Sequence, residues 1–178
     1  MRTSKKQLLI KTALELVEKH GLDGLTYEAL SQASGLSKSG LIYHFPSRDA
    51  LLKDMNQFMI EDFEQQLIAT AGGTADEVDL LNRLKATLIV LSRSATRAEL
   101  LLSLEIHNNT ELHDAWDNIF YRWGCHQDGI DKEPIFYLCK VIADGMWLHD
   151  HISTAPLTQQ HREKLIATAL ALLDSTNI

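Results

Sequence analysis

The sequence predicts an all-α protein of about nine helices, in which an N-terminal three-helix unit precedes a larger helical bundle. Apolar residues recur at three- and four-residue spacing along most of the chain, and the alternation typical of strands is almost absent. The three prolines, Pro46, Pro134 and Pro156, each stand where a helix could begin. Because 45% of the 178 residues are hydrophobic and 23% are charged, we expect a globular chain rather than a disordered or fibrous one.

Composition also excludes several classes of protein. No apolar run approaches the roughly 18 residues of a membrane span, and no apolar stretch typical of a secretory signal follows the basic start MRTSKK. Two cysteines, Cys125 and Cys139, are too few for a disulfide framework or a zinc ribbon. They are expected to be ordinary buried thiols, although a redox switch stays open as an alternative. We therefore expect a cytoplasmic protein that has no membrane partner.

Charge is distributed unevenly along the chain. Residues 1–53 hold eight Lys and Arg against five Asp and Glu, a net charge of +3. Residues 54–178 hold nine against nineteen, a net charge of −10. A basic segment joined to an acidic one suggests a piece that faces nucleic acid and a second piece with another task. We place a domain boundary between them, which gives domains 1–53 and 54–178.

The first helix is predicted to begin after Ser4 and to end at Gly21. Ser4 can cap its start, Gln7 three residues later completes a capping box, and Gly21 can supply a left-handed stop. Spacing places five residues on one face of this helix: Leu9, Ala13, Leu16, Val17 and His20.

Two very short helices follow and share one pattern. Each has a hydroxyl residue at the N-cap, Thr26 or Ser37, with a leucine directly before it and another leucine four residues after it. Such a pattern is a capped helix start with a hydrophobic staple. Gly35 stands between the two, where the chain must reverse sharply. Short helix, glycine-containing turn and short helix together predict a helix-turn-helix.

The second short helix leaves a polar outward face. With Leu41 and Phe45 turned toward the core, the outward residues are Ser37, Lys38, Ser39, Gly40, Tyr43 and His44. Hydroxyls, a cation, a phenol and an imidazole can all hydrogen-bond to phosphates or base edges, and a glycine allows the backbone to approach a groove. The preceding helix begins at Thr26 and Tyr27, where amides and a hydroxyl suit a phosphate. The plainer alternative is a solvated face on a small helical domain.

The rest of the chain is also predicted to be helical. Phe45-Pro46 ends the second short helix, and Ser47-Arg48-Asp49 opens a long one. A loop at residues 71–74 follows, with Thr74 or Asp76 as the next cap. Further helices fit residues 78–95, 97–109, 111–126, 133–151 and 158–174, the last two marked by Pro134 and Pro156.

Several spaced residues of the first third occur together: Ala13, Leu16, Gly21, Thr26, Leu30, Gly35-Leu36-Ser37, Leu41 to Arg48, and Leu51-Leu52. In this set, residues 4–53 resemble the DNA-binding domain of the TetR family of bacterial transcriptional regulators. The resemblance implies a homodimer whose recognition helices enter successive major grooves of a palindromic double-stranded DNA operator. Carried over by position, the implied DNA contacts are Thr26, Ser37, Lys38, Ser39, Gly40, Tyr43, His44 and Lys53. Ser31 and Arg48 depart from the residues usual in the family, alanine and lysine.

In the acidic two-thirds the resemblance concerns dimerisation and an effector. Ala143 to His149 is similar to the penultimate helix of such regulators, and the last helix carries a wide apolar stripe. These features favour a homodimer through the last two helices, although both stripes could instead be internal core. The candidate effector-binding residues are His107, Asn108, Trp116, Phe120, Tyr121, Trp123 and Trp147. Excess acidic charge and aromatic faces favour a neutral or cationic effector.

No motif predicts catalysis, a metal or a cofactor. The chain lacks His-Glu-x-x-His, a glycine-rich phosphate loop and Gly-x-Ser-x-Gly, and His149 and His151 would point to different faces of a helix. The sequence therefore predicts a non-enzymatic, sequence-specific DNA-binding repressor that a small molecule releases from its operator. The alternatives are a DNA-binding dimer without an effector and, less favoured, a helical metal-binding or catalytic protein.

Overall fold

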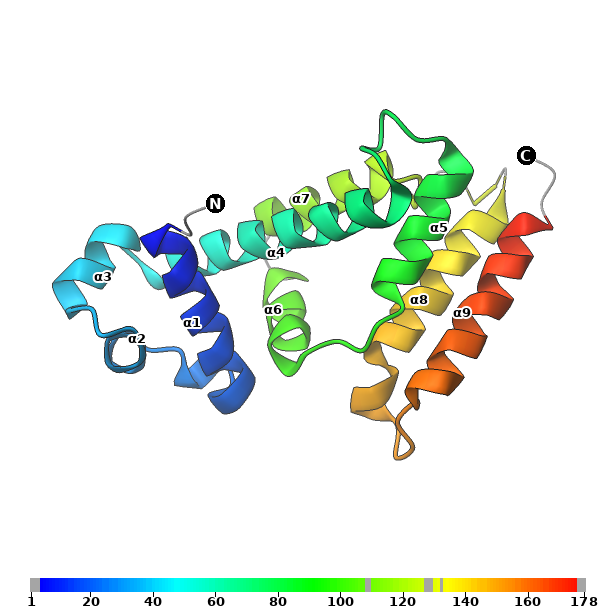
Figure 1. Cartoon of the computed structure of the whole chain (residues 1–178). Helices are drawn as coiled ribbons and strands as arrows, with labels where there is room; N and C mark the ends of the chain where they lie inside the picture. The colour runs from blue at the N-terminus through cyan, green and yellow to red at the C-terminus, as the bar shows by residue number, and fades with distance from the viewer. Residues whose placement is uncertain (1–3, 108–109, 127–129, 132, 176–178) are drawn as a thin grey trace. The chain divides into compact units, whose positions relative to one another are not determined.

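The computed structural model describes residues 4–107, 110–126, 130–131 and 133–175 (Figure 1). Within these ranges the chain forms nine α-helices and one 3-10 turn and contains no strand, which confirms the predicted all-α class. The elements are α1 Lys5–His20, η1 Leu22–Gly24, α2 Tyr27–Ser34, α3 Lys38–His44, α4 Arg48–Ala71, α5 Leu80–Leu91, α6 Arg97–His107, α7 Thr110–Arg122, α8 Pro134–Ile152 and α9 Gln159–Asp174. Among these helices none combines the length and the apolar character that crossing a membrane requires.

The chain folds into two compact units. Unit 1 consists of residues 1–61 and 96–113, and unit 2 consists of residues 62–95 and 114–178. α6 therefore returns to the N-terminal helices, whereas α5, α8 and α9 belong to the second unit. The predicted domain boundary after residue 53 stays a prediction.

In unit 1 the N-terminal helices form as local sequence signals dictate. The Ser4 hydroxyl accepts the Gln7 N–H at 3.1 Å and the Gln7 side chain accepts the Ser4 N–H at 3.2 Å, which confirms the capping box. α1 then packs against α2 and α6. The buried side chains of this core include Leu9, Ala13, Val17, Leu30, Leu41, Phe45 and Met55.

The two short helices also begin and end as predicted. Thr26 Oγ1 accepts the Ala29 N–H at 3.1 Å, and Ser37 Oγ accepts the Gly40 N–H at 3.2 Å. Gly35 ends α2 at φ 71° and ψ 6°, the left-handed conformation that glycine adopts without steric cost. The helix-turn-helix is thus present, with caps on both helices.

The start of α5 corrects one prediction. Its N-cap is Asp79, whose carboxylate accepts the Asn82 N–H at 2.8 Å, and not Thr74 or Asp76. The hydroxyl and the amide of Thr74 instead donate to the Glu77 carboxylate, each at 2.8 Å, in a local turn. These hydrogen bonds lower the pKa of Glu77. α5 and α7 are also shorter than predicted, ending at Leu91 and Arg122.

In unit 2, α5 packs against α8 and α9, and α8 packs against α9. Pro134 is the first residue of α8, as predicted, whereas Pro156 lies two residues before the α9 N-cap, Thr158. The core of this unit includes Leu84, Leu88, Ile119, Trp123, Cys139, Ala143 and Leu173.

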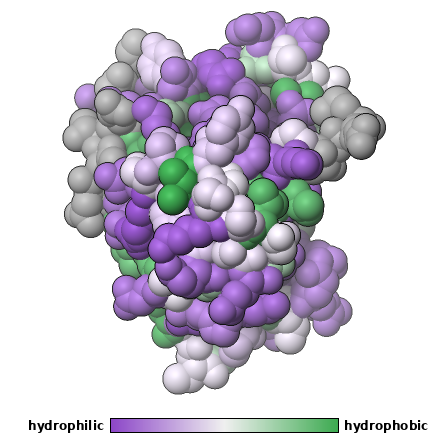
Figure 2. Space-filling model, turned by 90° about the vertical axis from the view of Figure 1, so that its left-hand side faces the viewer, coloured by the Kyte–Doolittle hydropathy of each residue, from purple (hydrophilic) through white to green (hydrophobic). Residues whose placement is uncertain are grey.

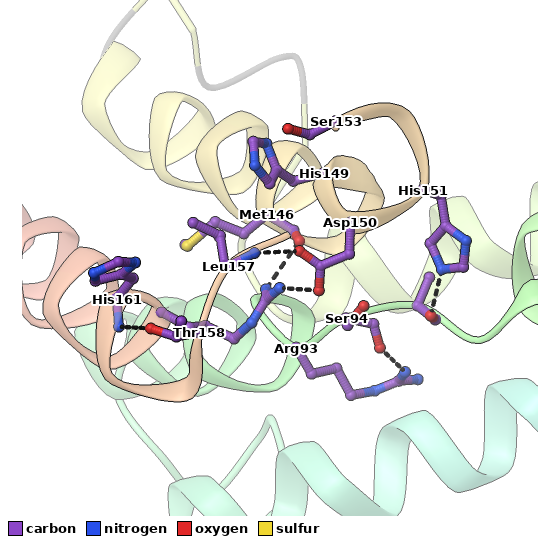
Figure 3. A network of polar contacts seen from close by, with 12 residues as sticks. Arg93, Ser94, Met146, His149, Asp150, His151, Ser153, Leu157, Thr158 and His161 are labelled. Atoms are coloured by element: carbon purple, nitrogen blue, oxygen red, sulfur yellow. Dashed lines mark hydrogen bonds and ion pairs between the residues drawn. The ribbon is translucent and has the colours of Figure 1, made fainter. Parts of the chain in front are cut away.

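A buried arginine joins the ends of three helices of this unit (Figure 3). Arg162 of α9 donates from Nη1 to the carbonyl oxygens of Ser92, at 2.6 Å, and Met146, at 2.9 Å. Its Nη2 donates to Asp150 of α8 at 2.7 Å, and the same carboxylate accepts the Leu157 N–H at 2.9 Å. Because the guanidinium is paired and hydrogen-bonded, its burial is compensated.

Candidate nucleic-acid interface and effector region

The start of α2 and the outward side of α3 present a polar surface, which we call the α2–α3 face. Its exposed residues are Thr26, Glu28, Ser37, Lys38, Ser39 and Tyr43. Figure 2 views the molecule from the side on which α2 and α3 lie in Figure 1, and polar side chains cover much of that side, with a few hydrophobic ones among them. Hydroxyls, an ammonium and a phenol on one surface can reach phosphates and base edges.

Tyr43 is the most exposed large side chain of this face. Its side chain is 85% exposed, and its ring meets the ring of His44 edge-on, with centroids 5.4 Å apart. His44 itself is half-buried. One turn of α3 thus projects a phenol into solvent while its neighbour supports the ring.

Hydrogen bonds to the backbone fix α3 in place. The Tyr27 hydroxyl donates to the Phe45 carbonyl at 2.5 Å, and the Ser31 hydroxyl donates to the Leu36 carbonyl at 2.5 Å. Burial raises the pKa of Tyr27. The Tyr27 hydroxyl is therefore engaged within the fold, and the DNA contact expected at Tyr27 stays a prediction. The unusual Ser31 likewise has a structural reason, because it secures the turn between the two helices.

The packing around residue 40 within the protein also favours a glycine there. A Cβ at this position would lie 3.0 Å from Leu36 Cδ2 and 3.4 Å from Ser37 Oγ, both tight contacts. Leu36 therefore leaves little room for a larger residue at this position, and the close approach of Gly40 to a groove stays a prediction.

Lys38 pairs with Glu28 across the turn. Lys38 Nζ lies 2.5 Å from Glu28 Oε1, and both side chains are more than half exposed. The hydrogen bond from Lys38 lowers the pKa of Glu28. The sequence does not indicate this role of Glu28, because the paired residues lie on two helices, ten residues apart, and no helical i, i+4 spacing joins them.

Further cations of unit 1 lie on α1 and α4. Lys6 pairs with Asp54 at 2.7 Å, and Arg48 lies 3.7 Å from Glu105. Lys53, a predicted DNA contact, is exposed on α4.

In unit 2, an aromatic cluster is formed by Phe63 of α4 with Trp116 and Phe120 of α7. Ring centroids lie 5.6 Å apart for Phe63–Trp116, 5.9 Å for Phe63–Phe120 and 6.2 Å for Trp116–Phe120. The Lys140 ammonium lies 4.3 Å from the Phe120 ring centroid and 2.6 Å from Asp144 Oδ2. The cluster therefore already binds a cation between an aromatic face and a carboxylate.

The remaining candidate effector residues lie in different surroundings. Tyr121 is exposed and its ring lies tilted against that of His126, with centroids 4.7 Å apart, and Trp123 is fully buried. The indole N–H of Trp123 has no acceptor within the described part of the chain. Trp147 is half-buried. Asn108 and the side chain of His107 lie outside the described residues. The sequence does not indicate that Phe63 joins this cluster, because its place beside α7 depends on contacts distant in sequence.

The histidine-rich end of α8 is occupied by backbone contacts. His151 Nε2 lies 2.7 Å from the Ala95 carbonyl oxygen (Figure 3). His149 Nε2 lies 3.3 Å from the carbonyl oxygen of Ala155. Elsewhere, side-chain atoms of the exposed residues His113, Asp114 and Asp117 lie within 4.8 Å of one another. Exposed acidic groups commonly gather in this way without a metal, so the group by itself does not make a metal site.

Both cysteines are buried and free, as predicted. Burial raises the pKa of Cys125 to about 12 and also raises the pKa of Cys139. Since the thiolate is the reactive form, both thiols are poorly suited to nucleophilic or redox chemistry.

Comparison with known proteins agrees with this arrangement of helices. Residues 9–55 match the model of bacterial regulatory proteins of the tetR family, and residues 81–174 match that of the tetracyclin repressor-like C-terminal domain. The HTH-type transcriptional regulator RutR of Escherichia coli K12 is 35% identical over 49 residues, 28% of this chain and 23% of that protein. The tetracycline repressor protein class C of Escherichia coli is 33% identical over 60 residues, 34% of this chain and 27% of that protein. These matches span about a quarter of each relative.

Solved structures match nearly the whole chain. A transcriptional regulator from Rhodococcus sp. Rha1 superposes with a TM-score of 0.73 at 16% identity, over 96% of both chains. The fatty acid degradation regulator FadR from Bacillus halodurans gives a TM-score of 0.60 at 14% identity, over 99% of this chain and 98% of that one. At such identities the similarity establishes the fold.

Proposed function

Because the chain belongs to the TetR family of bacterial regulatory proteins, we propose that it is a homodimeric transcriptional repressor, released from a palindromic DNA operator by a small-molecule effector. The observation that carries the proposal is the α2–α3 face. Two capped short helices hold Lys38 and the 85%-exposed Tyr43 on one outward surface, above a buried core of Leu41 and Phe45. A rigid helix with such side chains fits the major groove.

The proposal is tested by selecting bound sequences from random duplexes and measuring the affinity of single variants for the selected site. Lys38→Ala and Tyr43→Ala should each weaken binding by about 5- to 100-fold, the range of one specific contact. Matched controls are Lys164→Ala and Tyr121→Ala, which remove the same side chains from exposed positions of unit 2. Wild-type affinity in both test variants would show that the face is wrongly assigned.

An exposed apolar stripe on α8 supports dimerisation through the last two helices. Leu138, Val141, Leu148 and Ile152 recur at three-, four- and seven-residue spacing and are between 37% and 71% exposed. Gly145 lies in the same row, and a Cβ there would meet nothing within 4 Å. α9 adds the exposed residues Leu165 and Leu172. Two such helices and their symmetry mates would form an isologous four-helix interface.

The aromatic cluster supports a neutral or cationic effector. The Lys140 ammonium lies over the Phe120 ring and pairs with Asp144. A ligand cation that displaces this ammonium would contact the same aromatic face and the same carboxylate. In a thermal-shift screen we expect quaternary ammonium compounds or neutral aromatic compounds to stabilise the protein, and Phe120→Leu to reduce the shift. Stabilisation by polyanions alone would contradict this choice.

A further inference from the structure

Glu28 is an acidic residue on a surface proposed to face a polyanion. It lies in the first turn of α2, and its side chain is 64% exposed. Its neighbours on the α2–α3 face are the N-cap Thr26 and, across the turn, Lys38. Any duplex that engages Lys38 therefore brings phosphates or base edges close to a carboxylate.

The ion pair with Lys38 does not by itself explain why an acidic residue occupies position 28. Both partners are more than half exposed, and exposed ion pairs contribute little to the stability of a protein. A carboxylate near a helix N-terminus also interacts favourably with the helix dipole, which is a structural alternative. If that were its role, removing the charge would weaken the helix and with it the binding of every duplex.

When the protein binds DNA, the Glu28–Lys38 ion pair either stays closed or opens so that Lys38 can contact the duplex. If the Lys38 ammonium turns to a phosphate or to a guanine, Glu28 loses its partner and is repelled by the phosphates. In the major groove the group that best satisfies a carboxylate is the exocyclic amine N4 of cytosine. A duplex that offers this amine at the right position recovers the interaction, and a duplex that lacks it does not.

We propose that Glu28 is a specificity-determining residue, which accepts a hydrogen bond from a cytosine amine in the operator and penalises duplexes without one. This inference rests on the proposed DNA-binding function. The proposed role of Glu28 depends on the sequence of the duplex. A role in stabilising the protein would affect the binding of all duplexes equally.

The test compares Glu28→Gln with the wild-type chain on the selected duplex and on a random-sequence duplex, each fluorescently labelled and titrated at fixed low salt. Glu28→Gln should bind the random duplex about fivefold more tightly, the effect of one unit charge at contact distance in water. Its affinity for the selected duplex should not rise, so that the ratio of the two affinities falls. Selection repeated with the variant should lose a cytosine preference at one position of each half-site and keep the other positions.

The matched control is Glu61→Gln. Glu61 is exposed on α4, eight residues after Lys53, the predicted DNA contact on this helix, which is about 12 Å along the helix axis. The same change of charge there should leave both affinities unchanged, because this distance exceeds the Debye length of about 10 Å at 0.1 M salt. In a Lys38→Ala background, Glu28→Gln should still raise the affinity for the random duplex, since the repulsion does not depend on the pair.

The outcomes separate this inference from the proposed function. A wild-type chain that binds no duplex overturns both. If the wild type binds a selected duplex but Glu28→Gln behaves like Glu61→Gln, only the inference fails. It also fails if Glu28→Gln weakens binding to both duplexes by the same factor, which is the result expected of a purely structural glutamate.

Discussion

Tyr27 illustrates how a residue of the predicted interface can serve the fold. Its hydroxyl donates to the Phe45 carbonyl at the end of α3 and so joins the start of one short helix to the end of the next. Tyr27→Phe keeps the ring and removes this hydrogen bond. We expect the free energy of unfolding to fall by about 1 kcal/mol, measured by urea denaturation.

The matched comparison for this prediction is Tyr43→Phe, which removes a hydroxyl from an 85%-exposed ring. That variant should unfold like the wild type. Equal stability of the Tyr27 and Tyr43 variants would contradict the structural role assigned to Tyr27.

Residues whose partners are close in sequence were the easiest to predict. Ser4, Thr26, Ser37 and Gly35 were all assigned correctly, because a cap or a left-handed stop depends on neighbours within four residues. No local spacing indicates the contacts of Glu28 and Phe63, since their partners lie on other helices.

At the scale of whole helices, a comparison of two glycines distinguishes the cost of backbone strain from the cost of steric crowding. Gly35, after α2, has φ 71° and nothing within 4 Å of an added Cβ, whereas Gly124, after α7, has φ 82° and would place a Cβ 2.5 Å from Leu80 Cδ1. Gly35→Ala should cost about 1–2 kcal/mol of unfolding free energy through the left-handed backbone alone. Gly124→Ala should cost about 1 kcal/mol more, because Leu80 must turn away. Equal losses in denaturant titrations would contradict the steric part.

Helix ends of unit 2 are joined by Asp150, whose contribution to stability depends on pH. The Leu157 N–H, the Ser94 hydroxyl and Arg162 together lower the pKa of this carboxyl. A lowered pKa in the folded state stabilises the protein above the ordinary value of 3.8, and this contribution is lost as the pH falls through the folded-state pKa. Asp150→Asn should therefore lose about 1–3 kcal/mol at neutral pH.

The difference in unfolding free energy between Asp150→Asn and the wild type should narrow as the pH falls below 3.8. Asp76→Asn, an exposed aspartate in the loop before α5, is the control and should be neutral throughout. If the difference in unfolding free energy were independent of pH, the charge of the Asp150 carboxylate would not contribute to the stability of these helix ends.

Element boundaries show where local signals are insufficient. The start of α5 was misplaced because Thr74, an acceptable cap by sequence, is bound instead by Glu77 three residues later. The sequence does not indicate that Arg162 is a core residue, since its partners Ser92, Met146 and Asp150 belong to other parts of the chain. Contacts of this kind follow from the packing of helices and leave no pattern in the sequence.

For the molecule as a whole, the main prediction for residues 54–178 is that they form a homodimer through α8 and α9. Val141 is 50% exposed in the apolar row of α8 and Ile89 is 40% exposed on α5. Val141→Asp should place two charges in the isologous interface and convert the dimer to monomers in sedimentation equilibrium. Ile89→Asp, an equal change outside the row, should remain dimeric. A dimeric Val141→Asp, or a monomeric wild type, would contradict the assignment.

The measurement that tests the account most directly is protection of the selected duplex from dimethyl sulfate, which methylates guanine N7 in the major groove. Bound wild-type protein should protect guanines in two half-sites about 34–36 Å apart, and Tyr43→Ala should need a concentration about 5- to 100-fold higher to give the same protection. A duplex that is bound while its major-groove guanines stay fully reactive would contradict the claim that the α2–α3 face reads DNA.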